Sequence, residues 1–130
     1  MNPYGITDNS YHLLINAFSQ YPEIEKVILF GSRAKGNYKK GSDIDLVIKG
    51  KDCNEQIAFN LNAFLNEELP IPYHIDILYY DGLDHKELKE HIDRVGKLFY
   101  EAKKDTLVNE PKIDYTKKNI KKKDQNTERE

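Results

Sequence analysis

The first part of the chain carries two kinds of apolar pattern, one with helical spacing and one with strand spacing. The helical pattern occupies the i, i+3, i+4 and i+7 positions of one face: Tyr11, Leu14, Ile15 and Phe18. Asp8 or Asn9 can cap this helix. Residues 27–30 are entirely apolar and stop at Gly31, which predicts a buried strand. A second strand is predicted over residues 43–48, where every second residue is isoleucine or leucine.

The middle of the chain predicts a helix followed by a third strand. Asp52 and Glu55 have the spacing of a capping box, and the helix they begin ends before Pro70. Its apolar positions are Ile57, Ala58, Leu61, Phe64 and Leu65. Residues 73–79 then predict the third strand.

The last predicted helix begins at a second capping pattern, formed by Asp84 and Glu87. Its apolar stripe is Leu88, Ile92 and Val95. Gly96 follows as a C-cap, and residues 98–100 predict one more short strand.

These elements predict an α/β (α+β) domain over residues 1–102, with helices packed on a small mixed β-sheet. The order is helix, strand, strand, helix, strand, helix, with the short strand last. A helical crossover joins the second and third strands, which makes these two strands parallel.

Residues 103–130 differ in composition from this domain. They hold eight lysines and one arginine against six acidic residues, a net charge of +3, and few apolar side chains. Such a segment cannot bury enough apolar surface to offset the entropy lost on ordering. We therefore expect a charged, flexible tail, which serves either to keep the protein soluble or as an arm that contacts a partner.

The overall composition excludes several other classes. The chain has 130 residues, which fits one domain, and its lone Cys53 excludes an internal disulfide or a cysteine-built zinc site. No apolar run approaches the roughly 18–20 residues of a membrane span, and no signal peptide is evident, so we expect a cytoplasmic protein. The net charge of −2 gives no reason to expect direct nucleic-acid binding.

The polar residues after the first strand form a candidate phosphate site. Gly31 allows the backbone a close approach to a ligand at positive φ. The Ser32 hydroxyl and the free N–H groups of a short helical turn can hold a phosphate. Arg33 and Lys35 add positive charge beside it.

Three carboxylates form a candidate metal site. Asp43 and Asp45 are two residues apart on the second strand, which points both to one face. Their repulsion calls for a cation, and oxygen ligands select Mg²⁺. Asp76 interrupts the apolar third strand and can face Asp45 if the two strands are neighbours, completing a site for two metal ions. Each piece alone is common, but the combination points to phosphate chemistry.

The sequence Gly31-Ser32, ten residues, Asp43-x-Asp45 resembles the nucleotidyltransferase superfamily typified by DNA polymerase β. Within it, the chain resembles the minimal nucleotidyltransferases, the MNT or MntA-type antitoxins. The resemblance covers roughly residues 5–101. It implies the polymerase β-like fold and nucleotide transfer from ATP, with release of pyrophosphate.

The resemblance also implies residue roles and a partner. Asp43, Asp45 and Asp76 would bind two Mg²⁺ ions and carry catalysis. Gly31 and Ser32 would hold the β- and γ-phosphates. The partner would be a HEPN-domain ribonuclease toxin in a type VII-like toxin–antitoxin pair. AMP transfer to a toxin tyrosine would inactivate it, within a hetero-oligomer.

Two other functions remain open at this stage. A small-molecule nucleotidyltransferase, similar to enzymes that adenylylate aminoglycosides, would lack its acceptor domain here. A non-catalytic antitoxin that occludes its toxin would have no need of three converging carboxylates.

Overall fold

The computed structural model describes residues 2–103. Its elements, in order, are α1 (Asp8–Ser19), β1 (Lys26–Phe30), α2 (Gly31–Lys35), β2 (Ile44–Lys49), α3 (Glu55–Glu67), β3 (Ile75–Tyr79), the 3₁₀ turn η1 (Tyr80–Gly82), α4 (Lys86–Val95) and β4 (Lys97–Glu101). Every predicted helix and strand is present. The predicted tail lies outside the described residues from position 104 onward, and its flexibility stays a prediction. No helix within the described range is long and apolar enough to cross a membrane.

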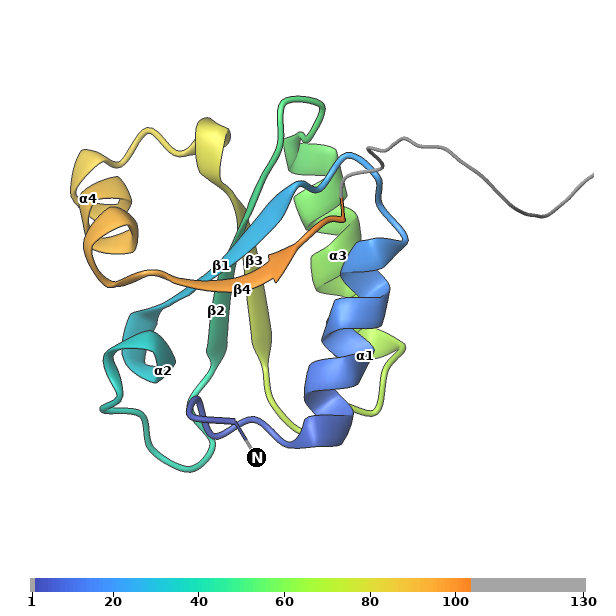
Figure 1. The fold of residues 1–130 in the computed structure, drawn as a ribbon, viewed down its shortest axis with the longest axis vertical. Helices are drawn as coiled ribbons and strands as arrows, with labels where there is room; N and C mark the ends of the chain where they lie inside the picture. The colour runs from blue at the N-terminus through green and yellow to red at the C-terminus, as the bar shows by residue number, and fades with distance from the viewer. Residues whose placement is uncertain (1, 104–130) are drawn as a thin grey trace, which may run out of the picture.

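The four strands form one mixed sheet in the order β3-β2-β1-β4 (Figure 1). Strand β1 pairs antiparallel with both β2 and β4. Strands β2 and β3 pair in parallel, as the helical crossover predicted. The mixed sheet with its helices confirms the predicted fold class.

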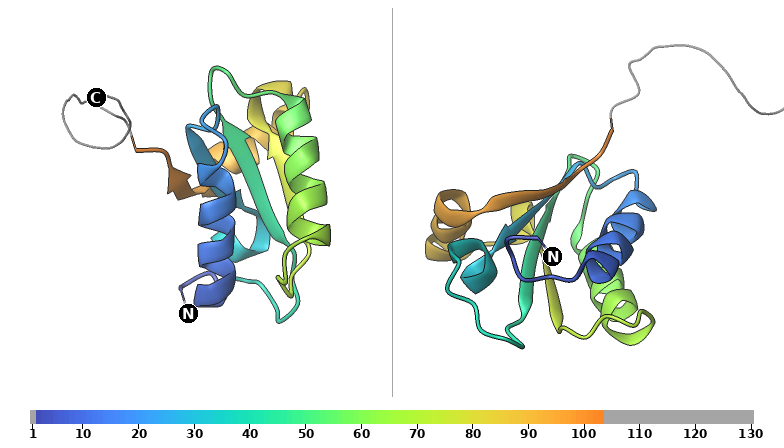
Figure 2. Two further views of the ribbon diagram at one scale, coloured as in Figure 1. Left: turned by 90° about the vertical axis from the view of Figure 1, so that its right-hand side faces the viewer. Right: turned by 60° about the horizontal axis from the view of Figure 1, so that its bottom comes forward.

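The helices divide between the two faces of the sheet (Figure 2). Helices α1 and α3 cover one face, where the large core cluster lies; fully buried members include Leu14 and Phe18 from α1, Leu29 and Leu46 from the sheet, and Leu61 from α3. On the other face α4 covers a smaller cluster, made of Phe30, Val47 and Ile92. Alternate residues of β1, β2 and β3 supply the two clusters, because strand side chains point to opposite faces.

The helices begin at other caps than those the sequence suggested. Thr7 Oγ1 accepts a hydrogen bond from the Ser10 backbone N–H at 3.2 Å. Asn54 Oδ1 caps α3 at 3.0 Å, and His85 Nδ1 caps α4 at 3.1 Å. The predicted caps are wrong by one or two residues: Asp8 or Asn9, Asp52 and Asp84. Each true cap has extended backbone, a tertiary property that residue type alone does not reveal. Gly96 does end α4, but with extended backbone and not in the left-handed conformation.

Two asparagines of α3 close the outer edge of the sheet at β3. Asn62 accepts a hydrogen bond from the Ile77 N–H and donates one to the Ile77 carbonyl, both at 2.8 Å. Asn66 repeats this arrangement on Ile75, at 2.9 and 2.7 Å. The side-chain amides thus replace a neighbouring strand, which leaves these edge groups paired.

Candidate active site

Gly31 makes the turn from β1 into α2. Its φ is +75°, a conformation that L-residues with a side chain rarely adopt. A Cβ at this position would also overlap the Asp45 carboxylate. The backbone at the start of α2 therefore comes directly against Asp45, and only glycine permits this approach. The positive φ predicted for this position is confirmed, whereas the predicted close approach to a ligand stays a prediction.

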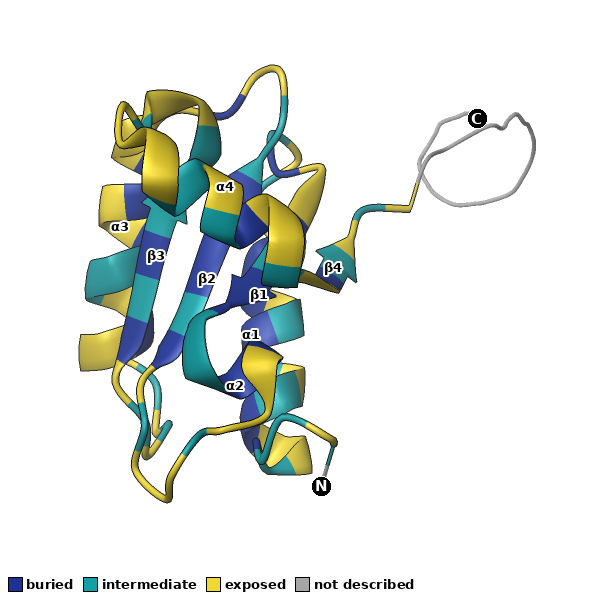
Figure 3. Cartoon of the chain, turned by 90° about the vertical axis from the view of Figure 1, so that its left-hand side faces the viewer, coloured by how far each residue is buried: buried dark blue, intermediate teal, exposed yellow. Residues whose placement is uncertain are grey.

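Asp45 and Asp76 are paired in register on the parallel strands β2 and β3. Both are half-buried and lie on the sheet face that carries α2 and α4. Figure 3 shows α4 and α2 in front of the sheet on this side, with β2 and β3 running beside them. The sequence left the pairing conditional on neighbouring strands, and the register confirms that the two aspartates face each other.

Asp43 lies one residue before β2 and is exposed. It therefore belongs to the loop that enters the strand and not to the regular strand that the sequence predicted. The position still leaves it close enough to influence Asp45 electrostatically.

The electrostatics of the three carboxylates centre on Asp45. Burial raises the pKa of Asp45 above its ordinary value, and the negative charges of Asp76 and then Asp43 raise it further. His74 and His91 act in the opposite direction but do not cancel the shift. Ionised Asp45 is therefore disfavoured in the protein alone, and a cation beside it would relieve the repulsion.

The donor chemistry of this site fits Mg²⁺, since carboxylate oxygens are its preferred protein ligands. Within residues 2–103, however, no three His, Cys, Asp or Glu side chains are grouped closely enough to hold a metal ion. The fit therefore rests on the type and charge of the donors, and Mg²⁺ binding stays a prediction.

Arg33 is 2% exposed, although the sequence suggested that it contacts nucleotide. Its Nε and Nη2 both donate to the Ser42 carbonyl, at 3.2 and 2.8 Å. Its Nη1 donates to the carbonyls of Tyr4 at 2.8 Å and Gly5 at 3.3 Å. These bonds tie α2 to the N-terminal segment and to the residue before Asp43. A nucleotide contact of Arg33 stays a prediction, and its hydrogen-bond partners in the structure are all backbone carbonyls.

Ser32 and Lys35 are accessible to solvent, whereas Arg33 is buried. Ser32 is partly exposed in the first turn of α2, where no side chain of the described chain caps the helix. The first N–H groups of this helix therefore have no intrahelical partner. Lys35 is exposed. Both remain accessible to a phosphate.

Sequence patterns did not mark His91 as part of the site. Its ring packs edge-on against Phe30, 6.3 Å between centroids, and its charge acts on Asp45. The contact depends on how α4 folds back over β1, and no spacing motif in the sequence encodes that packing.

Comparison with known proteins identifies the family. The profile of the family described as "Polymerase beta, Nucleotidyltransferase" matches residues 13–105. The chain therefore belongs to the polymerase β nucleotidyltransferase family. It is 30% identical over 89 residues to MJ1547 of Methanocaldococcus jannaschii, whose name assigns it provisionally as a protein adenylyltransferase. That match covers 60% of this chain and 71% of the relative.

Solved structures share the fold. A chain of a toxin–antitoxin complex with AMP-PNP superposes with a TM-score of 0.57 at 18% identity, covering 74% of this chain and 75% of that chain. A complex of a tri-AMPylated Shewanella oneidensis HEPN toxin with an MNT antitoxin gives a TM-score of 0.54 at 18% identity, covering 72% and 71%. These likenesses establish the polymerase β-like fold that the sequence predicted.

Proposed function

We propose that this protein is an Mg²⁺-dependent protein adenylyltransferase that transfers AMP from ATP to a tyrosine of a HEPN-domain toxin. It would act as the antitoxin of that pair. The observation that carries the proposal is the contact between two halves of the motif. Gly31 brings the start of α2 against Asp45, and Asp45 faces Asp76 across two parallel strands.

The reaction proposed is an in-line displacement at the α-phosphorus of ATP. A bond forms between the tyrosine oxygen and this phosphorus. The bond between the same phosphorus and the oxygen that bridges to the β-phosphate breaks. Pyrophosphate leaves, and the hydroxyl proton passes to a carboxylate of the site, for which Asp76 is the candidate. Positioning and charge neutralisation supply most of the rate in such transfers.

Two groups of residues would have separate roles in this reaction, one binding phosphate and the other binding metal. The Ser32 hydroxyl and the unpaired N–H groups of α2 would bind the β- and γ-phosphates, with Lys35 adding positive charge. Asp43, Asp45 and Asp76 would hold Mg²⁺, which supplies charge neutralisation at the triphosphate when bound.

The partner is proposed from the relatives. MJ1547 carries the name of a protein adenylyltransferase, and the fold is shared with an antitoxin bound to an AMPylated HEPN toxin. The domain has no second lobe within residues 2–103 that would enclose an acceptor. A protein partner that completes the site would provide that surface.

The test combines the purified protein, a HEPN-domain protein encoded beside it, Mg²⁺ and ATP labelled on either the α- or the γ-phosphate. We expect the partner to acquire label only from the α-labelled ATP. Replacing the partner's acceptor tyrosine with phenylalanine should abolish this labelling. Transfer from γ-labelled ATP would identify a kinase instead. A tight complex that acquires no label would identify an antitoxin that acts by occlusion.

A further inference from the structure

A pocket lies between the loop that joins α2 to β2, the N-terminal segment and the residues before β3. Its volume is about 530 Å³, within the range of ligand pockets. The side chains that give it chemical character are Arg33, Tyr38, Lys39, Lys40, Pro72 and Tyr73. Neither the three carboxylates nor Gly31 and Ser32 line it, so the proposed reaction makes no use of this pocket.

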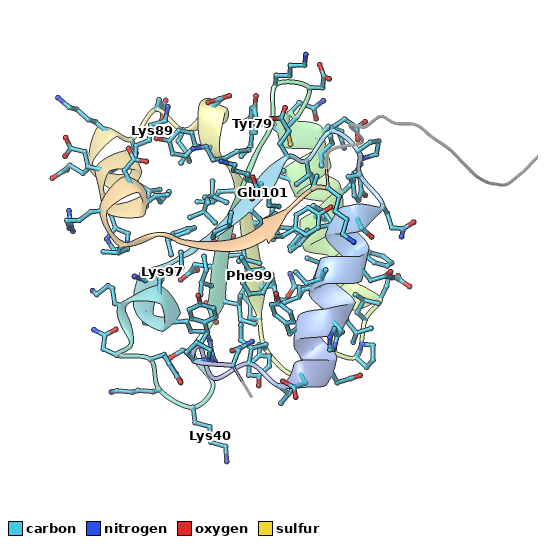
Figure 4. All side chains as sticks on the ribbon, viewed as in Figure 1. Lys40, Tyr79, Lys89, Lys97, Phe99 and Glu101 are labelled. Atoms are coloured by element: carbon cyan, nitrogen blue, oxygen red, sulfur yellow. The ribbon has the colours of Figure 1, made fainter. Side chains whose placement is uncertain are left out.

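The charge of this pocket is entirely positive. Arg33 is buried at its base, with its donors on backbone carbonyls, and no acidic side chain lines the pocket. Lys39 and Lys40 are exposed at its rim, and Figure 4 shows Lys40 extending from this loop away from the fold. Because all the charged side chains that line the pocket are positive, an anion there would be attracted by all three of them.

The walls of the pocket are aromatic and held in place. The Tyr38 and Tyr73 rings lie 5.0 and 4.9 Å from the Arg33 guanidinium. The Tyr73 hydroxyl donates to the Gly5 carbonyl at 3.3 Å. A Cβ on Gly5 would overlap the Tyr38 side chain, so glycine at this position lets that ring pack closely. Aromatic surfaces beside lysines are the combination that binds a nucleobase together with its phosphate.

We propose that this pocket binds a nucleoside monophosphate, with the phosphate on the lysine rim and the base against the tyrosines. The proposal rests on the pocket alone and not on the proposed transfer reaction. Binding requires no metal ion, because lysine and arginine supply the positive charge. It should weaken as salt is raised, because the two lysines are exposed to solvent.

The experiment titrates the full-length protein with AMP in the absence of divalent cations, by calorimetry or by NMR chemical shifts. We expect saturable binding that is at least fivefold weaker for Lys39→Ala/Lys40→Ala. The charge-matched control, Lys86→Ala/Lys97→Ala, removes two exposed lysines from other elements and should bind as the unaltered protein does. Thermal melting of both double variants verifies that they are folded.

Two further ligands test the two halves of the pocket. Adenosine and inorganic phosphate should each bind at least tenfold more weakly than AMP. Equal binding of phosphate would overturn the role of the tyrosines, and equal binding of adenosine would overturn that of the lysines. Absence of saturable AMP binding, or equal weakening by both double variants, would overturn the proposal. Asp45→Asn should bind AMP unchanged, so failure of this proposal and failure of AMP transfer are separate results.

Discussion

Asp45 and Asp76 lie directly opposite each other on the neighbouring parallel strands β2 and β3. Burial and the charges of Asp76 and Asp43 raise the pKa of Asp45, so its ionised form is disfavoured in the folded state. A fold selected for stability alone would place an apolar residue at such a position. We interpret the pair as a site whose charge is balanced by what binds to it.

The burial of Asp45 and the repulsion from its neighbours predict that Asp45→Asn stabilises the protein. The pKa of Asp45 is higher in the folded than in the unfolded chain. Its contribution to the free energy of unfolding is therefore fully present below the unfolded pKa, and it is lost as pH rises through the folded pKa. At pH 7 the neutral variant should melt at a temperature roughly 2–5 °C higher. Calorimetry between pH 4 and 8 measures the difference, which should shrink toward acid. An equal gain from Asp84→Asn, at an exposed aspartate, would contradict this explanation.

Gly31→Ala should damage both stability and the site. The left-handed conformation alone costs a residue with a side chain roughly 1–2 kcal/mol, and the new methyl group overlaps Asp45. Gly36→Ala is the matched control, because Gly36 has φ +86° but a methyl group there would meet no atom within 4 Å. Both variants should lose stability in urea denaturation. Only Gly31→Ala should also slow AMP transfer, by roughly a hundredfold; equal rates for the two variants would exclude the contact with Asp45 as the cause.

Arg33→Met should destabilise the fold by about 3 kcal/mol. It leaves the carbonyls of Tyr4, Gly5 and Ser42 without their donor, and hydrogen bonds to charged groups contribute about 1.5–3 kcal/mol each. Lys35→Met, on the exposed side of the same helix, should change the free energy of unfolding by less than about 0.5 kcal/mol. Urea denaturation midpoints compare the two. Similar midpoints would mean that the Arg33 bonds contribute little.

Asn62→Asp should weaken the hydrogen bonding of α3 to the edge strand β3. A carboxylate cannot donate to the Ile77 carbonyl and is repelled by it, so this partly buried hydrogen bond is lost at a cost of about 2 kcal/mol. The repelled side chain should then move away from the strand edge, which also deprives the Ile77 N–H of its acceptor. Asn60→Asp makes the same charge change on the same helix, where the exposed side chain only accepts from Gln56. Hydrogen exchange at Ile77 should accelerate in Asn62→Asp and not in Asn60→Asp. Unchanged exchange in both would show that the asparagine does not protect this edge.

The sequence predicted the fold well because its elements are short and strongly patterned. The helical crossover between β2 and β3 fixed their parallel pairing, and this pairing placed Asp45 opposite Asp76. The Gly-Ser motif also predicted a positive φ at Gly31, which the structure confirms. These features depend on local spacing, which sequence patterns encode directly.

Other features depend on packing between distant segments. The burial of Arg33 follows from the N-terminal residues Tyr4 and Gly5 folding over α2, which no periodicity signals. The action of His91 on Asp45 likewise depends on the placement of α4. The pairing of Asn62 with the β3 backbone requires knowing which strand ends the sheet. None of these three contacts could be predicted without the tertiary structure.

The most direct test of the central claim is the rate of AMP transfer to the HEPN-domain partner by Asp45→Asn, measured against Asp84→Asn. Both substitutions remove one aspartate charge, but only Asp45 faces Asp76 and touches the start of α2. We predict a rate more than a hundredfold lower for Asp45→Asn, in a protein that melts no lower than the unaltered chain. Transfer by Asp45→Asn at the unaltered rate would contradict the assignment of this carboxylate pair as the catalytic centre.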